Sequence, residues 1–111
     1  MAYDEELAHR IREQLQDISG VTEMRMFGGL AFLVDGKMAV TASGKGGLLA
    51  RVDPAQTDRF ARGAHVDPFV MRNRPMEGWL RVDEAGVRTK RQLRTWVDRG
   101  VAYVRTLPAK R

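Results

Sequence analysis

Few residues of this chain have the types and spacing that catalysis needs. The two histidines, His9 and His65, lie far apart in the sequence. Asp67 follows His65 closely enough for its carboxylate to orient the imidazole, but no nucleophile accompanies the pair. Both histidines are therefore interpreted as surface residues, and a deep pocket around His65 or a retained small molecule would favour an enzyme.

Other catalytic and metal-binding motifs are also missing. Ser19 and Ser43 lie in turn-like segments without the G-x-S-x-G pattern of a hydrolase nucleophile. The sequence has no cysteine, which excludes thiol nucleophiles, disulfides and cysteine zinc sites. Its histidines and carboxylates do not have the spacing of zinc or calcium ligands. We therefore expect no enzymatic activity, no cofactor and no metal ion.

Two glycine-rich segments raise the question of phosphate binding. Ser43–Gly47 surrounds Lys45 with glycines, but it lacks the G-x-x-x-x-G-K-[ST] spacing between a strand and a helix. Gly28 and Gly29 lack the context of a dinucleotide-binding motif. The first segment is interpreted as a flexible connection between two antiparallel strands.

The charge of the chain is uneven. The formal net charge is +5 and the isoelectric point is about 10.2, which invites a nucleic-acid hypothesis. Residues 1–24 carry six acidic and two basic residues, whereas residues 88–111 carry eight basic residues and one acidic residue. The last segment offers candidate contacts for duplex nucleic acid or an acidic partner, namely Arg88, Arg91, Arg94 and Arg105. The alternative is that these arginines form the solvated outer face of a helix.

An amphipathic helix is predicted near each end of the chain. The first runs from an N-cap at Asp4 to Ser19, and Gly20 is its predicted stop. In the last helix, Thr89 and Gln92 have the spacing of a capping box. The apolar stripes are Leu7, Ile11, Leu15 and Ile18 in the first helix, and Leu93, Trp96, Val97, Gly100, Val101, Val104 and Leu107 in the last.

Between these helices the pattern changes to short strands. Asp35-Gly36 is typical of a type I′ hairpin turn, and Asp53-Pro54 is typical of the start of a short helix in which Phe60 points inward. The predicted strands are Thr22–Phe27, Leu30–Val34, Lys37–Thr41, Leu48–Val52, Phe69–Met71 and Gly78–Val82, and the short helix is Ala55–Arg62. The order predicts one α+β domain over residues 1–111: an antiparallel meander flanked by an N-terminal helix, a short middle helix and a long C-terminal helix.

The hairpin around Asp35-Gly36 has two apolar faces. A two-residue turn predicts one face with Leu30, Phe32, Val34 and Ala39, and another with Ala31, Leu33, Met38 and Val40. A sheet with one solvent-exposed face should alternate apolar and polar residues, and this hairpin does not. Either helices therefore cover both sides, or one face meets another subunit. We therefore expect a homodimer, with the second set as its candidate face. A bulge at Gly28-Gly29 would change this register.

A series of short motifs extends over nearly the whole chain. The motifs are Arg25–Gly29, Phe32, Asp35–Met38, Arg51–Asp53, Arg74–Met76, Gly78-Trp79 with Val82, Trp96-Val97, Ala102–Val104 and Leu107-Pro108. No single motif is diagnostic. The ordered set, over roughly residues 8–108, resembles the TfoX (Sxy) N-terminal domain family.

The resemblance implies a secretion-chaperone-like α+β sandwich, a type of fold in which dimers are common. It also implies a link to natural competence, because full-length members regulate competence promoters together with the cyclic-AMP receptor protein. Those members carry a second, helical domain that these 111 residues do not contain, so the regulatory role carries over weakly. The resemblance provides no catalytic residues.

These observations favour a non-catalytic protein-interaction module of the TfoX N-terminal type, a homodimer that could act as a transcriptional coregulator. The first alternative is a nucleic-acid-binding protein that uses the arginine-rich last helix. The second is a small enzyme with an unrecognised site. No apolar stretch is long enough to span a membrane and the acidic N-terminus does not resemble a signal peptide, so we expect a cytoplasmic protein without membrane contact.

Overall fold

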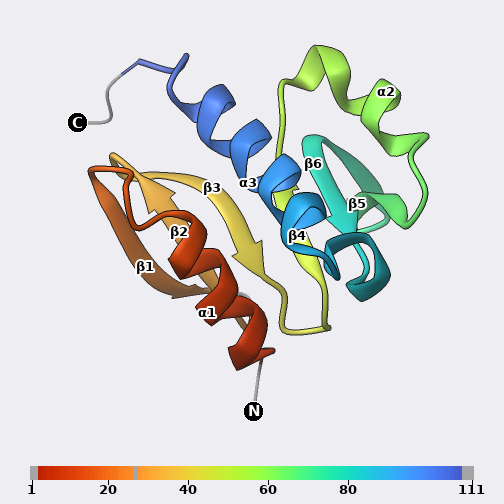
Figure 1. Ribbon diagram of the computed structural model, residues 1–111. Helices are drawn as coiled ribbons and strands as arrows, with labels where there is room; N and C mark the ends of the chain where they lie inside the picture. The colour runs from red at the N-terminus through yellow and green to blue at the C-terminus, as the bar shows by residue number, and fades with distance from the viewer. Residues whose placement is uncertain (1–2, 27, 109–111) are drawn as a thin grey trace.

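An antiparallel sheet of six strands forms the centre of the described part of the molecule (Figure 1). The computed structural model describes residues 3–26 and 28–108, so the predicted strand end at Phe27 lies outside it. The strands are β1 (Val21–Met26), β2 (Gly29–Val34), β3 (Lys37–Ala42), β4 (Leu48–Arg51), β5 (Val66–Met71) and β6 (Arg74–Val82). The helices are α1 (Glu5–Gln14), α2 (Thr57–Ala61) and α3 (Lys90–Val104), with 3₁₀ turns η1 (Pro54–Gln56) and η2 (Glu84–Val87). The strand order β1-β2-β3-β4-β6-β5 and the flanking helices confirm the predicted α+β class.

The first helix begins where the sequence predicts but ends earlier. The Asp4 side chain accepts hydrogen bonds from two backbone N–H groups of the first turn, which confirms this residue as the N-cap. The helix ends at Gln14 rather than at Ser19, and the chain continues in a series of turns. The predicted stop at Gly20 is therefore wrong. Gly20 has a φ of +77°, and its carbonyl accepts a hydrogen bond from the backbone N–H of Asp35.

The last helix has the predicted cap, and its apolar stripe is the predicted one except for Leu107, which lies beyond the end of the helix at Val104. Thr89 and Gln92 form both hydrogen bonds of a capping box. The buried residues of α3 are Leu93, Trp96, Val97, Gly100, Val101 and Val104. Gly100 lies where α3 crosses β3, and a Cβ atom there would be 2.6 Å from the carbonyl oxygen of Ala39. Glycine at this position therefore allows the helix to approach the sheet closely.

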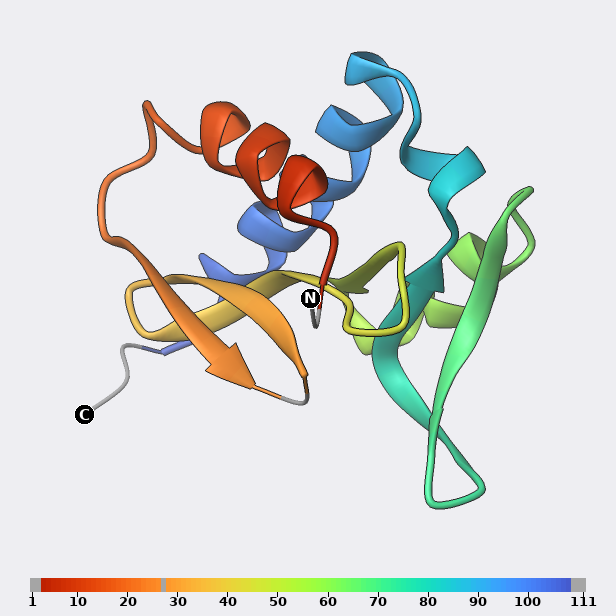
Figure 2. The same cartoon turned by 90° about the horizontal axis from the view of Figure 1, so that it is seen from below.

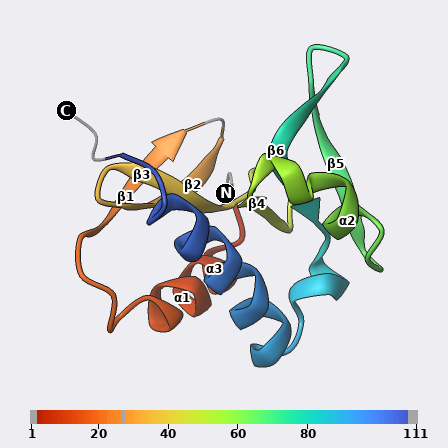
Figure 3. The same cartoon turned by 90° about the horizontal axis from the view of Figure 1, so that it is seen from above.

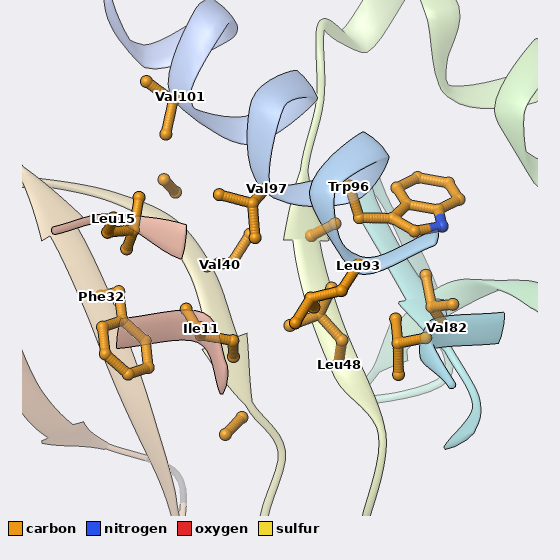
Figure 4. Close-up of a cluster of buried hydrophobic side chains, with 14 of the residues drawn as sticks. Ile11, Leu15, Phe32, Val40, Leu48, Val82, Leu93, Trp96, Val97 and Val101 are labelled. Carbon is orange, nitrogen blue, oxygen red and sulfur yellow. The ribbon is translucent and has the colours of Figure 1, made fainter. Parts of the chain in front are cut away.

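Both long helices lie on the same face of the sheet (Figures 1 and 2). Ile11 of α1, Phe32 of β2 and Leu93 of α3 are fully buried between the two layers (Figure 4). The short helix α2 lies beside β5 and β6, and its Phe60 ring contacts Trp96 edge to face, as its predicted inward orientation requires. No helix of the described residues covers the other face of β1, β2 and β3 (Figure 3). The alternative in which helices cover both faces is therefore wrong for these strands.

The register of the β2–β3 hairpin departs from the predicted one at Ala39. The turn at Asp35-Gly36 is as predicted, with φ values of +51° and +80° that are typical of type I′. Beyond it, Phe32 pairs with Val40, so Ala39 is the extra residue of a β-bulge that is not at the glycines. The bulge turns Val40 toward the core. The prediction that Val40 belongs to the candidate dimer face is therefore wrong.

The β5–β6 hairpin is longer than the sequence predicts. Both strands extend beyond the predicted segments Phe69–Met71 and Gly78–Val82. The turn between them is formed by Arg72 and Asn73 in left-handed conformations, with φ values of +53° and +64°. Such turns usually contain glycine, so this hairpin has a weak sequence signal.

Candidate interaction surfaces

The helix-free face of β1, β2 and β3 carries three methionines. Directly opposite residues share a face of a sheet, so Met24 lies beside Ala31, and Met38 lies beside Leu33. Thr41 also pairs with Ala31, and its hydroxyl donates a hydrogen bond of 3.3 Å to the Met38 sulfur. We call this set the methionine face, and its members are Met24, Met26, Ala31, Leu33, Met38 and Thr41.

The methionine face combines three buried residues with three methionines that are exposed or half-buried. Met24 is 50% exposed, and Met26 and Met38 are half-buried. The three remaining members are buried. No member carries a charge, and methionine side chains adapt readily to a partner surface. Three residues of the predicted dimer face, Ala31, Leu33 and Met38, thus lie together here.

The predicted arginine contacts are exposed, and two of them, Arg88 and Arg94, line a groove together with acidic residues. All four arginines, Arg88, Arg91, Arg94 and Arg105, are exposed. Arg94 Nε lies 3.7 Å from Asp98 Oδ2, one turn further along α3. The groove between α1 and α3 has a volume of about 550 Å³ and is lined by Glu13 and Asp17 as well as by Arg88 and Arg94. This mixture of charges weakens the attraction of the surface for a phosphate backbone.

His65 lines a pocket of about 440 Å³ between α2, η2 and α3. Its imidazole is exposed, as predicted, and its Nδ1 lies 3.4 Å from Asp83 Oδ1 rather than beside the predicted partner Asp67. Thr95 supplies the hydroxyl group in the pocket wall, and this hydroxyl donates to a backbone carbonyl of its own helix. The structure therefore does not pair His65 with a nucleophile in this pocket. His9 is also exposed, 4.0 Å from Glu13.

An ion pair connects α1 to β1 at the rim of the helix-covered face. Arg12 donates two hydrogen bonds to the Glu23 carboxylate, with N–O distances of 2.6 and 2.8 Å. These bonds lower the pKa of Glu23 and raise the pKa of Arg12. Both side chains are partly exposed, so the pair contributes little to stability.

Features of several other kinds of site are missing from the described residues. No group of three or more histidine, cysteine, aspartate or glutamate side chains in residues 3–26 and 28–108 could hold a metal ion. No helix in this part of the chain is long and apolar enough to cross a membrane.

Ser43–Gly47 joins two antiparallel strands, as predicted, and Arg81 donates hydrogen bonds to Ser43 Oγ and to the carbonyls of Lys45 and Gly46.

Some residues of these surfaces were not predicted from the sequence. Met24 and Met26 join the methionine face, and their alternation along β1 is the signal that could have placed them there. Arg59 and Arg99 line the His65 pocket from two different helices, and no local pattern relates them.

The sheet and its helices define the class of the protein, an α+β domain with its two long helices on one side of an antiparallel sheet. A sequence profile described as the TfoX N-terminal domain matches residues 13–103, which is most of the chain. The chain therefore belongs to the TfoX N-terminal domain family. No curated protein and no solved structure shows a significant match to it.

Proposed function

We propose that this chain is a non-catalytic protein-interaction module that binds through the methionine face to a second copy of itself. The supporting observation is the placement of the helices, because α1 and α3 cover the opposite face of the sheet (Figures 2 and 3). Apolar side chains that gather on an exposed surface mark interaction sites. Met24 is the most exposed member of this face.

A second copy is a suitable partner because of the charge distribution. The chain has a net charge of +5, but the methionine face has no charged member. Two copies that meet through this face keep their charged surfaces apart. A two-fold axis brings the same residues of both copies together, and flexible methionines can adjust to a surface like their own.

The substitution Met24→Glu tests this dimer. It changes an exposed side chain and would place two carboxylates in a symmetric apolar interface, where they repel each other and lose water. In sedimentation velocity at micromolar concentration, we expect the unchanged chain to be a dimer and Met24→Glu to be a monomer.

Ala102→Glu is the matched control, because it adds the same carboxylate at an exposed position of α3. This variant should remain a dimer. A monomeric unchanged chain, or equal sedimentation of both variants and the unchanged chain, would contradict the proposed interface.

The finer proposal is a role as a transcriptional coregulator, and membership of the TfoX N-terminal domain family supports it. The chain would then act on a DNA-bound regulator rather than on DNA. Adding the chain to the cyclic-AMP receptor protein should change the affinity of that regulator for a competence promoter. An unchanged affinity would argue against this role.

Direct nucleic-acid binding through α3 is the competing function. Exposed arginines such as Arg91 and Arg105 favour it, whereas the neighbouring Asp98 does not. Fluorescence anisotropy of a labelled DNA duplex separates the two, because phosphate contacts weaken steeply between about 50 and 200 mM salt. Salt-sensitive binding that is lost in Arg91→Glu would favour this alternative.

A further inference from the structure

The pocket beside His65 contains two arginines without a counter-ion. Arg59 of α2 and Arg99 of α3 line a volume of about 440 Å³, and no aspartate or glutamate lines it. Among the described residues, neither arginine forms an ion pair. Two positive charges thus share one hollow of the surface without a neutralising carboxylate in its walls.

Two aromatic rings hold the Arg99 guanidinium in this hollow. Its central carbon lies 4.0 Å from the ring centroid of Phe60 and 4.6 Å from the ring centroid of Trp96. The rings belong to α2 and α3, so their contacts with Arg99 connect the two helices. A cation–π contact uses the flat face of the guanidinium and leaves the N–H groups at its edge available to an anion.

Arg59 brings the second charge to the same place. Its guanidinium carbon lies 5.9 Å from the Phe60 centroid, so both arginines contact one ring. Burial, and then the charge of Arg59, lower the pKa of Arg99. The like charges repel each other, and a bound anion would remove this repulsion.

We propose that this pocket binds the phosphate group of a small organic phosphate monoester, with Arg59 and Arg99 as its contacts. Two guanidinium groups match the two negative charges of the monoester better than the single charge of a carboxylate. The walls also include Phe60, Val66 and Trp96, which offer apolar contacts to the organic part. The volume lies within the range of small-molecule sites. This site does not depend on dimerisation, because none of its residues belongs to the methionine face.

Isothermal titration calorimetry with phenyl phosphate tests the site in the full chain. We expect saturable binding of one molecule per chain. Arg59 is exposed, so Arg59→Gln should leave the fold intact while it removes one charged contact and weakens binding by about tenfold or more. Benzoate, which presents a carboxylate on the same ring, should bind more weakly than phenyl phosphate to the unchanged chain.

Arg91→Gln is the matched control, because Arg91 is an exposed arginine of α3 that does not line the pocket. Its affinity for phenyl phosphate should stay within about twofold of the unchanged chain, since the contact with the anion is intact. The proposal would be overturned if phenyl phosphate did not bind, or if benzoate bound more tightly than phenyl phosphate. It would also be overturned by an equal loss of affinity in Arg59→Gln and Arg91→Gln, which would mean diffuse attraction to a basic surface.

Discussion

The two faces of the sheet are built from different kinds of side chain. On the helix-covered face, Phe32, Val40 and Leu48 are fully buried against the helices. On the helix-free face, Met24 lies beside Ala31 and Met38 lies beside Leu33, and both of these smaller neighbours are buried. Branched and aromatic residues pack in few arrangements, whereas methionine has three rotatable bonds and fills irregular surfaces.

This difference separates folding from binding within one sheet. The covered face buries the apolar area that stabilises the domain, and its close packing makes it sensitive to any change in volume. The methionine face contributes less burial and keeps exposed side chains that can adjust to a partner. Substitutions on the two faces should therefore have different consequences, and the predictions below run from the largest effect to the smallest.

The largest effect is expected for Phe32→Ala on the covered face. Phe32 is fully buried, so its truncation leaves a cavity and should lower the free energy of unfolding by about 3–5 kcal/mol. Urea denaturation measures this loss, and the loss should not depend on protein concentration.

Met24→Ala provides the comparison on the helix-free face. At the lowest concentration at which unfolding can be followed, it should change the free energy of unfolding by less than about 0.5 kcal/mol, because Met24 is half exposed. A larger loss at high concentration would reflect the dimer. Equal losses in the two variants at low concentration would show that the faces do not divide folding from binding.

The last helix and the order of the elements along the chain could be predicted from the sequence because their signals are local. The capping box at Thr89 and the stripe of α3 follow from spacing within one segment. The bulge at Ala39 could not be predicted, because it accompanies the close approach of α3 to β3 at Gly100. That contact joins segments about sixty residues apart, and it decides which face receives Val40.

Gly100→Ala tests whether this close approach fixes the covered face. Alanine favours a helix over glycine by about 1 kcal/mol, so helix propensity alone predicts stabilisation. The new Cβ atom would instead be 2.6 Å from a backbone oxygen of β3, which must move. We expect a net loss of about 1–3 kcal/mol in the free energy of unfolding.

The reverse exchange at an exposed position of α3 is the control for this substitution. Ala102→Gly should cost about 1 kcal/mol through helix propensity alone, since Ala102 is exposed. Urea denaturation measures the change in the free energy of unfolding for each variant, and both changes should be losses. A more stable Gly100→Ala variant would mean that the helix can move away from the sheet at little cost.

The candidate sites could be predicted only where their residues lie close together in the sequence. The Ala31, Leu33 and Met38 part of the methionine face follows from alternation and one hairpin turn. The pocket at His65 does not, because Arg59 and Arg99 are about forty residues apart and meet only when α2 packs against α3. Each arginine alone has the sequence signal of an ordinary surface residue.

Among the substitutions on the helix-covered face, the smallest effect is expected for Glu23→Gln, which removes the ion pair with Arg12 at the rim of that face. Both side chains are partly exposed, so the loss in the free energy of unfolding should be below about 1 kcal/mol at neutral pH. The hydrogen bonds from Arg12 lower the pKa of Glu23 in the folded chain. The contribution of these bonds to the free energy of unfolding is therefore fully present above the pKa that Glu23 has in the unfolded chain. It is lost as the pH falls through the lowered pKa of Glu23 in the folded chain.

Urea denaturation of Glu23→Gln and the unchanged chain at pH 7 and at about pH 3 checks this sign, because the two should converge in acid. Glu77→Gln is the control, since it removes an exposed carboxylate that forms no ion pair among the described residues. A difference between Glu23→Gln and the unchanged chain that persists in acid would mean that Glu23 acts through packing. The rim would then resemble the buried interior of the covered face, and the contrast between the faces would extend to the edge of the sheet.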